Sequence, residues 1–190
     1  DVLIQAYSSL LKQGRLPTNT QLILVGGTGP ETETLETIVN DLNLEKQVRF
    51  LSAISDNELC WLNKHSELLV IHSSTEGFCL PLVEALAWDA KVVCSDIPIF
   101  REVGNSSCTY FDITAAEISD RPRADPFVET SFVKSPLIGQ LAEAIACVVA
   151  TSSTKNNHLS PQHNPQFSKD YVAQQLLDFY ASRKPTHAET

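Results

Sequence analysis

Short apolar runs alternate with amphipathic stretches along residues 21–111, and this alternation restricts the fold more than any other feature of the sequence. Each run has the length and composition of a strand that is buried on both faces. Strands that alternate with helices over tight connections form βαβ units. The sequence therefore predicts an α/β fold, with a doubly wound parallel sheet covered by helices on both faces. The predicted strands are QLILV (21–25), VRFL (48–51), ELLVI (67–71), KVVC (91–94) and CTYF (108–111).

Local signals mark the ends of several helices. Gly14 follows a stretch with helical spacing, residues 1–13, as a left-handed C-cap does. Ser55 and Glu58 have the spacing of a capping box, which predicts a helix that runs to about His65. Further helices are predicted at 31–42, 81–88, 98–103 and 137–150.

The sequence divides into three predicted parts. Residues 1–150 form the α/β domain, with an irregular excursion over 113–135. Residues 151–167 are polar, contain proline and lack periodicity, so we expect a flexible loop. Residues 168–190 predict a helix and a frayed tail. The chain begins within an apolar-periodic stretch at Asp1 and contains no methionine, so we expect it to be a piece of a longer protein.

Composition narrows the classes of partner. The 190 residues carry a formal net charge of −9, from 23 acidic and 14 basic side chains. An acidic protein is poorly suited to bind the phosphate backbone of a nucleic acid, so nucleic-acid binding is not expected. No apolar run approaches the ~20 residues of a membrane span, so membrane association would come only from parts outside this sequence. Five scattered cysteines without a CxxC pair indicate neither a disulfide framework nor a zinc site, and they favour the reducing cytoplasm.

The segment HSSTEGFCLPLVEAL, residues 72–86, contains most of the candidate ligand-binding residues. It begins where the predicted strand 67–71 ends, at the edge where an α/β sheet holds its ligands. The predicted helix start offers backbone N–H groups to an anion such as a diphosphate, and the glycine before it lets a ligand approach closely. We expect these N–H groups to belong to Phe78, Cys79 and Leu80, and the glycine that allows the close approach is Gly77.

Two glutamates lie on either side of this predicted helix start. An ionised carboxylate only accepts hydrogen bonds, and it can take two from adjacent hydroxyls. A carboxylate aimed at a phosphate would repel it, so Glu76 and Glu84 are expected to flank the anion and to bind diols. A nucleotide-diphosphate sugar presents its groups in this order: ribose diol, diphosphate, sugar hydroxyls.

Two glutamates with seven residues between them, E-GFCLPLV-E, resemble the E-x7-E motif of the family 4 (group 1) retaining glycosyltransferases of GT-B fold. The strings LVGGTGP, VRFLSAISDNEL and KVVCSDIPIFREV are similar to the carboxyl-terminal, donor-binding domain of that family. The resemblance is close over residues 1–112, weaker over 113–166 and faint at 167–180. It implies that the fold is the Rossmann-like half of a GT-B glycosyltransferase.

The resemblance also implies a role for each site residue. Glu76 corresponds to the glutamate that contacts the donor sugar and stabilises charge at the reacting carbon, and Glu84 to the one that binds the ribose. The backbone of residues 78–80 faces the sugar and the diphosphate, and Gly27 lies in the turn near the nucleotide. The implied partners are a nucleotide-diphosphate sugar and an acceptor domain upstream, with no cofactor and no metal site.

Among the departures of this sequence from the pattern of the family, two concern the donor site and the sheet. Cys79 stands where the family usually has a glycine, so a positive φ there would strain the backbone. The family's first strand, with its phosphate-binding Arg and Lys, is expected ahead of residue 1 and in the centre of the sheet, so the strands beside it would lack a ladder partner. Since the acceptor domain is expected there too, we predict that these 190 residues alone have no transferase activity.

Two other interpretations remain open. The departures favour a degenerate, non-catalytic domain that binds nucleotide sugars or serves in assembly. A sugar-phosphate phosphorylase or epimerase of the same two-domain architecture would need other residues in the cleft. Dinucleotide binding is disfavoured, because Thr32 replaces the third glycine of the fingerprint and Glu31 and Glu33 would face the pyrophosphate.

Overall fold

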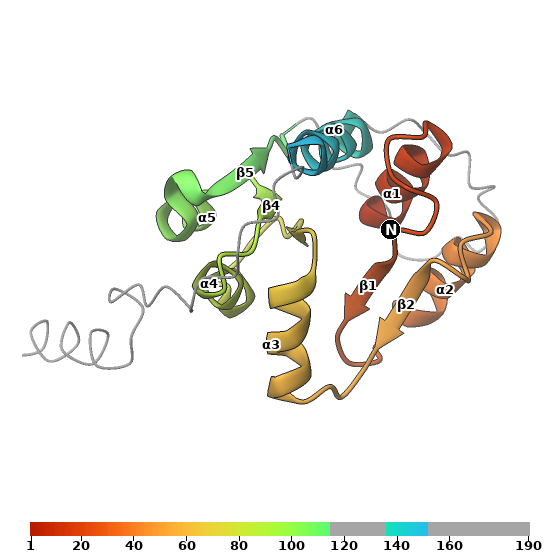
Figure 1. The fold of residues 1–190 in the computed structure, drawn as a ribbon, viewed down its shortest axis with the longest axis horizontal. Coiled ribbons are helices and arrows are strands. Elements are labelled where there is room, and N and C mark those ends of the chain that lie inside the picture. Colours follow the sequence, from red (N-terminus) through yellow and green to blue (C-terminus); the bar gives the residue numbers. More distant parts are fainter. Residues whose placement is uncertain (115–135, 152–190) are drawn as a thin grey trace, which may run out of the picture.

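A computed structural model describes residues 1–114 and 136–151 of the chain. Helices and strands alternate over these ranges as the sequence predicts (Figure 1). The predicted loop and carboxyl-terminal helix, from residue 152 on, and residues 115–135 of the predicted excursion lie outside the described residues. The elements are α1 (Val2–Lys12), β1 (Leu22–Val25), α2 (Thr32–Asp41), β2 (Val48–Leu51), α3 (Asp56–His65), β3 (Leu69–Ile71), α4 (Leu80–Ala87), β4 (Val92–Ser95), α5 (Pro98–Gly104), the short 3₁₀ helix η1 (Asn105–Ser107), β5 (Cys108–Phe111) and α6 (Pro136–Ala150).

The strands form two parallel sheets. β1 pairs with β2, with Leu24 opposite Phe50, and β4 lies between β3 and β5, with Val93 opposite both Val70 and Thr109. The single sheet expected from the alternation is thus divided between β1 and β3, and neither strand has a partner on its inner edge among the described residues. This division agrees with the expectation that two strands of the sheet would lack a ladder partner.

Two apolar clusters hold the described elements together. The first packs α1 against α6 and the strands, and Leu10 and Leu141 are fully buried in it. The second packs α4 and α5 against the other face of β4, around the buried Leu82. Alternate residues of β4 enter the two clusters, Val93 the first and Cys94 the second. β4 is therefore buried on both faces, as predicted for the strand at 91–94.

β1 differs from the prediction. The run 21–25 is expected to be buried on both faces, but Ile23 is 40% exposed and Val25 is 47% exposed. Leu22 and Leu24, which point to the opposite face, pack against the first cluster. Because the described helices cover only one face of the β1–β2 sheet, the continuous apolar run is half-exposed in the structure, and the prediction is wrong for that face.

The local helix signals are confirmed. Gly14 has a φ of +66° and its N–H donates to the Leu11 carbonyl at 3.0 Å, just beyond the end of α1. The Ser55 N–H donates to Glu58 Oε2 at 2.7 Å, and the Glu58 N–H donates to Ser55 Oγ at 3.3 Å, which completes the capping box of α3.

All five cysteines lie in the described ranges and are free thiols. Within these ranges the structure contains no helix with the length and hydropathy to cross a bilayer.

Cys79, the residue before α4, has the strained backbone that its place in the motif predicts. Its φ of +68° and ψ of +76° are left-handed, a conformation that costs an L-residue about 1–2 kcal/mol. The side chain is only 8% exposed and packs in the second cluster. Cys79 therefore combines a buried side chain with a backbone conformation that glycine would adopt without strain.

Gly104 ends α5 where no side chain fits. A Cβ built on Gly104 would lie 2.5 Å from Cys108 Sγ and 2.8 Å from the Tyr110 hydroxyl. The Tyr110 hydroxyl is held in place because it donates to the carbonyls of Phe100, at 3.0 Å, and Asn105, at 2.8 Å. The absence of a side chain at Gly104 thus lets β5 pack closely against the end of α5.

We predict that the Cys79→Gly variant is more stable than the Cys79→Ala variant by about 1 kcal/mol. Both substitutions remove the thiol, but only alanine keeps the Cβ that strains the left-handed backbone. The free energy of unfolding, measured by denaturant titration, tests this difference. An alanine variant that equals or exceeds the glycine variant in stability would show that the backbone strain is absent.

A second prediction concerns Gly104. The Gly104→Ala variant should lose about 1–3 kcal/mol of stability, because the new methyl group overlaps Cys108 and Tyr110. Gly139, within α6, is the matched control, since a Cβ there meets nothing within 4 Å. Gly139→Ala should instead stabilise the chain by about 0.5–1 kcal/mol, as alanine does in a helix. Equal effects at the two positions in denaturant titrations would contradict the packing seen at Gly104.

Candidate functional site

The connection between β3 and α4 carries most of the predicted site residues. It leaves the carboxyl end of β3 at Ile71 and runs through exposed residues to Cys79. Within it, the Ser73 hydroxyl donates to Glu76 Oε1 at 2.8 Å. This hydrogen bond orients one oxygen of the Glu76 carboxylate and leaves the rest of the group open to solvent.

The amino end of α4 presents backbone N–H groups. The first N–H groups of a helix have no partner within the helix. Leu80 opens α4 and Pro81 follows at the second position, one residue later in the helix than predicted. Because Pro81 has no N–H and the Leu82 N–H donates to the Cys79 carbonyl at 3.1 Å, the Leu80 N–H is the helix donor nearest to the loop. The positive end of the helix dipole lies at the same place.

Glu84 lies on the exposed face of α4. It follows Leu80 by four residues, so the two side chains share one face of the helix, and Leu80 is 62% exposed. Leu82 and Ala85 form the opposite face and are fully buried in the second cluster. Packing of this apolar face therefore sets the rotation of α4 and presents Glu84 outward.

The two glutamates therefore lie on either side of the amino end of α4. Glu76 precedes the helix in the loop, and Glu84 follows one turn inside it, with both carboxylates exposed. Gly77 and Phe78, which lie between Glu76 and the strained Cys79, are also exposed. The connection from β3 and the first turns of α4 thus bring together six of the seven predicted site residues.

Gly27, the seventh, follows a strand of the other sheet. It belongs to the turn after β1, in the two-stranded sheet, where the Gly26 N–H donates to Leu51 and the Gly29 N–H donates to Thr32 Oγ1 at 2.9 Å. β1 and β3 are not hydrogen-bonded to one another. The structure therefore does not join the Gly27 turn to the Glu76 connection through a shared sheet.

The sequence prediction missed the partner of Glu76. Ser73 was not assigned to the site, although it precedes Glu76 by three residues, the same spacing that signals the capping box of α3. A hydroxyl and a carboxylate at this spacing meet whenever the chain between them turns. A serine three residues before a glutamate was therefore the sequence signal from which the hydrogen bond between Ser73 and Glu76 could have been predicted.

The thiol of Cys79 is not an activated nucleophile. Burial raises its pKa, outweighing a backbone hydrogen bond from Leu82 that acts in the opposite direction. The thiol therefore stays protonated at neutral pH. Among the described residues no group of three or more His, Cys, Asp or Glu side chains is placed to hold a metal ion.

The chain is similar to bacterial sugar transferases. Over 89 residues it is 40% identical to the O-antigen chain mannosyltransferase RfbU of Salmonella typhimurium, a match that covers 47% of this chain and 25% of that protein. Over 109 residues it is 33% identical to the serotype-specific mannosyltransferase WbdA of Escherichia coli, with 57% of this chain and 13% of that protein covered. The matched part thus spans a quarter or less of these relatives.

Solved structures show the same architecture. Sucrose-phosphate synthase from Thermosynechococcus elongatus superposes with a TM-score of 0.54 at 18% identity, over 94% of this chain and 41% of that one. The pneumococcal O-GlcNAc transferase GtfA, in complex with UDP and GlcNAc, superposes with a TM-score of 0.51 at 16% identity, over 96% and 32%. At these identities the likeness concerns the fold, which is a Rossmann-like half of a GT-B glycosyltransferase.

The family assignment follows from the sequence match. The family described as glycosyl transferases group 1 matches residues 1–109, which is more than half of the chain. The E-x7-E spacing lies within this range, from Glu76 in the connection after β3 to Glu84 in α4. The chain therefore belongs to the group 1 glycosyltransferases.

Proposed function

We propose that this domain is the donor-binding half of a retaining glycosyltransferase, which moves a sugar from a nucleotide-diphosphate sugar to an acceptor hydroxyl. The observation that carries the proposal is the placement of Glu76 and Glu84 on either side of the amino end of α4, in a member of this family. The donor would bind beyond the carboxyl end of β3.

Each part of the donor has a matching group in this site. The diphosphate would lie at the amino end of α4, where the Leu80 N–H and the helix dipole favour an anion. The carboxylate of Glu84 would accept hydrogen bonds from the ribose diol, and that of Glu76 from the sugar hydroxyls. Placing the two carboxylates on either side of the diphosphate avoids repulsion between like charges.

The relatives suggest the class of sugar. RfbU and WbdA are named as mannosyltransferases, and GtfA was solved with UDP and GlcNAc bound. These names are consistent with a hexose as the transferred group. The site residues do not distinguish the nucleotide base, so the titration below uses several donors.

The reaction would proceed on one face of the sugar. The bond from the anomeric carbon to the diphosphate oxygen breaks as the acceptor oxygen bonds to the same face, and the acceptor proton passes to the departing diphosphate. The protein would place the reactants and stabilise charge on the leaving group, which electrostatic groups such as helix amides do well. Glu76, beside the sugar, would stabilise charge at the anomeric carbon.

Further parts of the protein would complete the enzyme. The acceptor would bind to a separate upstream domain, and closure of the two domains would exclude water. The five free thiols of this chain favour the reducing cytoplasm as the compartment.

A degenerate binding or assembly domain is the second candidate function. The observation that favours it is Cys79, which occupies a left-handed position with a buried side chain instead of the glycine usual in the family. A domain that had lost catalysis would tolerate such a substitution more readily than an active one. Measurements of donor binding and of sugar transfer distinguish the active donor-binding domain from the degenerate one.

We predict that Glu84→Gln weakens donor binding by about 10- to 100-fold, because the neutral amide forms weaker hydrogen bonds to the ribose than a carboxylate does. Calorimetric titration of UDP-, GDP- and ADP-sugars into the whole protein measures the effect. Glu45→Gln is the matched control, since Glu45 is an exposed glutamate in the turn before β2, at the amino end of a strand in the other sheet. Equal losses at Glu84 and Glu45 would contradict the proposed ribose contact, and no binding by the whole protein would favour the degenerate domain.

A second prediction concerns transfer itself. The 190-residue chain should form no product, because the proposed acceptor domain would supply the other half of the cleft, whereas the whole protein should transfer sugar. Glu76→Gln in the whole protein should lower kcat by about 100-fold, the order of magnitude for a lost electrostatic contact to the transition state. Product formation, followed by mass spectrometry with a single donor, tests both statements. Transfer by the 190-residue chain would overturn the first, and an unchanged kcat for Glu76→Gln would overturn the second.

A further inference from the structure

The side chain at the capping position of α4 makes no hydrogen bond to the helix. Cys79 occupies this position, and its side chain packs in the second apolar cluster. At the amino end of α3, by contrast, Ser55 Oγ accepts the Glu58 N–H at 3.3 Å. Because the first N–H groups of a helix have no partner within it, those of α4 attract an acceptor from the connection or from a ligand.

Glu76 is a candidate acceptor within the connection itself. It precedes Cys79 by three residues, and a Cβ on the intervening Gly77 would meet nothing within 4 Å, so packing does not hold the chain there. Burial is the main cause of the raised pKa of the Cys79 thiol, and the negative charge of Glu76 raises this pKa further. The Glu76 carboxylate therefore lies within electrostatic range of the amino end of α4, where a negative charge is stabilised.

The Ser73 hydroxyl binds this carboxylate. It donates to Glu76 Oε1 at 2.8 Å, and the charge of the acceptor strengthens the hydrogen bond. Ser73 lies two residues beyond the end of β3 at Ile71 and is half-buried, whereas the three residues after it are exposed. β3 is held in register by β4, with Val70 opposite Val93. The hydrogen bond thus ties an exposed carboxylate to a segment that is anchored in the sheet.

We propose that Ser73 is a positioning residue, which holds the Glu76 carboxylate away from the amino end of α4 and so keeps the helix N–H groups available to the diphosphate of the donor. This inference rests on the proposed function, because it takes the diphosphate to bind at α4. Without the Ser73 hydroxyl, Glu76 would turn to the helix, accept its first N–H and compete with the diphosphate for the same place.

This role differs from that of a hydrogen bond that merely stabilises the connection. A stabilising bond would be missed whatever side chain stands at position 76. Competition with the diphosphate depends instead on the carboxylate of Glu76, so removal of that carboxylate should reverse the effect of losing Ser73. The two roles therefore predict opposite results for the double variant.

Titration of nucleoside diphosphates that lack a sugar tests the proposal. UDP, GDP and ADP are titrated calorimetrically into the whole protein, so that contacts between Glu76 and the sugar do not enter the result. For each diphosphate that the wild-type protein binds, Ser73→Ala should weaken binding by about 5- to 10-fold, the effect expected when a capping carboxylate has to be displaced. Ser73→Thr keeps the hydroxyl and should bind as the wild-type protein does.

The double variant Ser73→Ala/Glu76→Ala lacks both the hydroxyl and the competing carboxylate. It should bind the diphosphate as tightly as Glu76→Ala alone, within about 2-fold. A loss in the double variant as large as that in Ser73→Ala would show that Ser73 acts independently of Glu76 and would overturn the proposal. Unchanged binding by Ser73→Ala would overturn it as well but would leave the proposed donor site standing. Failure of the wild-type protein to bind any of the three diphosphates would overturn the proposed function, and this inference with it.

Hydrogen exchange at Leu80 gives a readout that needs no ligand. If Glu76 accepts the Leu80 N–H in Ser73→Ala, exchange of this amide should be about 5- to 10-fold slower than in the wild-type protein. NMR of the whole protein, isotope-labelled on leucine, measures the rate. The double variant should return to the wild-type rate. An unchanged rate at Leu80 in Ser73→Ala would contradict the competition on which the proposal depends.

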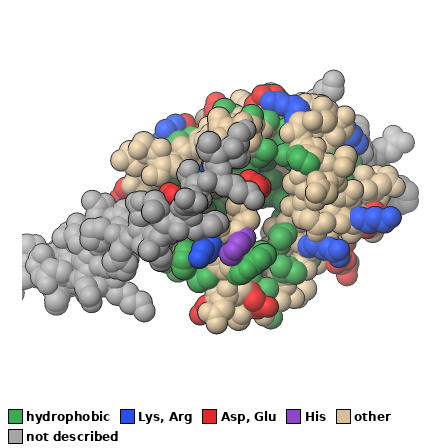
Figure 2. Space-filling view, viewed as in Figure 1, with side chains coloured by type: hydrophobic (Ala, Val, Ile, Leu, Met, Phe, Trp, Pro, Cys, Tyr) green, Lys and Arg blue, Asp and Glu red, His purple; other side chains and the backbone are tan. Residues whose placement is uncertain are grey.

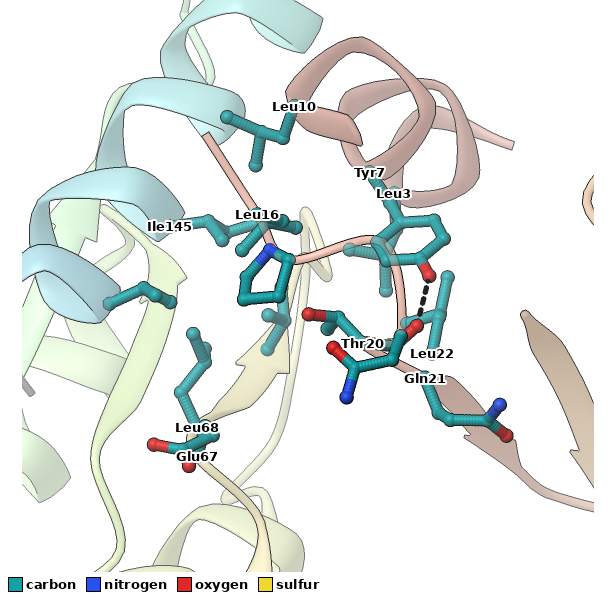
Figure 3. Close-up of a pocket in the computed structure, with 14 residues that line it drawn as sticks. Leu3, Tyr7, Leu10, Leu16, Thr20, Gln21, Leu22, Glu67, Leu68 and Ile145 are labelled. Carbon is teal, nitrogen blue, oxygen red and sulfur yellow. Dashed lines mark hydrogen bonds between the residues drawn. The ribbon is translucent and has the colours of Figure 1, made fainter. Parts of the chain in front are cut away.

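Tyr7 offers a matched control beside an apolar cavity of about 580 Å³ that opens between the two sheets, at Leu22 and Leu68 (Figure 3). None of the predicted donor-site residues lines this cavity. Figure 2 shows the molecule hollowed near its centre, with hydrophobic side chains around the hollow. The Tyr7 hydroxyl donates to the Thr20 carbonyl at 2.7 Å, so Tyr7→Phe loses one hydroxyl hydrogen bond, as Ser73→Ala does.

The Tyr7→Phe variant should lower the free energy of unfolding but leave the binding of nucleoside diphosphates and the exchange rate of Leu80 unchanged. Equal losses of binding in Tyr7→Phe and Ser73→Ala would show a general effect of lost stability and would overturn the proposed role of Ser73.

Discussion

Pairing of backbone groups between parallel strands is the constraint on which the rest of this structure depends. β4 is hydrogen-bonded on both sides and buried on both faces, with Val93 and Cys94 in different apolar clusters. It holds β3 in register, and the connection that carries Glu76 leaves from the end of β3. Leu82 packs in the second apolar cluster together with Cys94, and this packing fixes the position of α4 and of its amino end. The geometry of the candidate donor site therefore rests on a strand that contains none of its residues.

The same constraint explains the division of the sheet. Within residues 1–114 and 136–151, β1 and β3 each pair on one side only, and an apolar cavity lies between their beginnings. The Gly27 turn follows β1, whereas the Glu76 connection follows β3, so the two parts of the predicted site belong to different sheets. A strand between them would join both ladders and would give the two connections a common frame.

Cys79 shows how packing and local conformation compete. Its left-handed backbone is unfavourable for any residue with a Cβ, yet its side chain is buried beside α4. The motif predicts the strain, because this position usually holds glycine in the family. Burial of the thiol is a tertiary property that the motif does not contain. The raised pKa of the Cys79 thiol has the same origin, since burial disfavours the thiolate.

The sequence by itself determined the features that depend on near neighbours. Gly14 ends α1, Ser55 and Glu58 begin α3, and the residues from Glu76 to Glu84 lie together because they are contiguous in the chain. Tertiary structure alone decided the exposure of Ile23, the division of the sheet and the placement of Gly27 and Glu76 after strands of different sheets. These features depend on which strands are hydrogen-bonded to one another and on which faces of a sheet the helices cover. An apolar run such as LILV has the same sequence pattern whether one or both of its faces are buried.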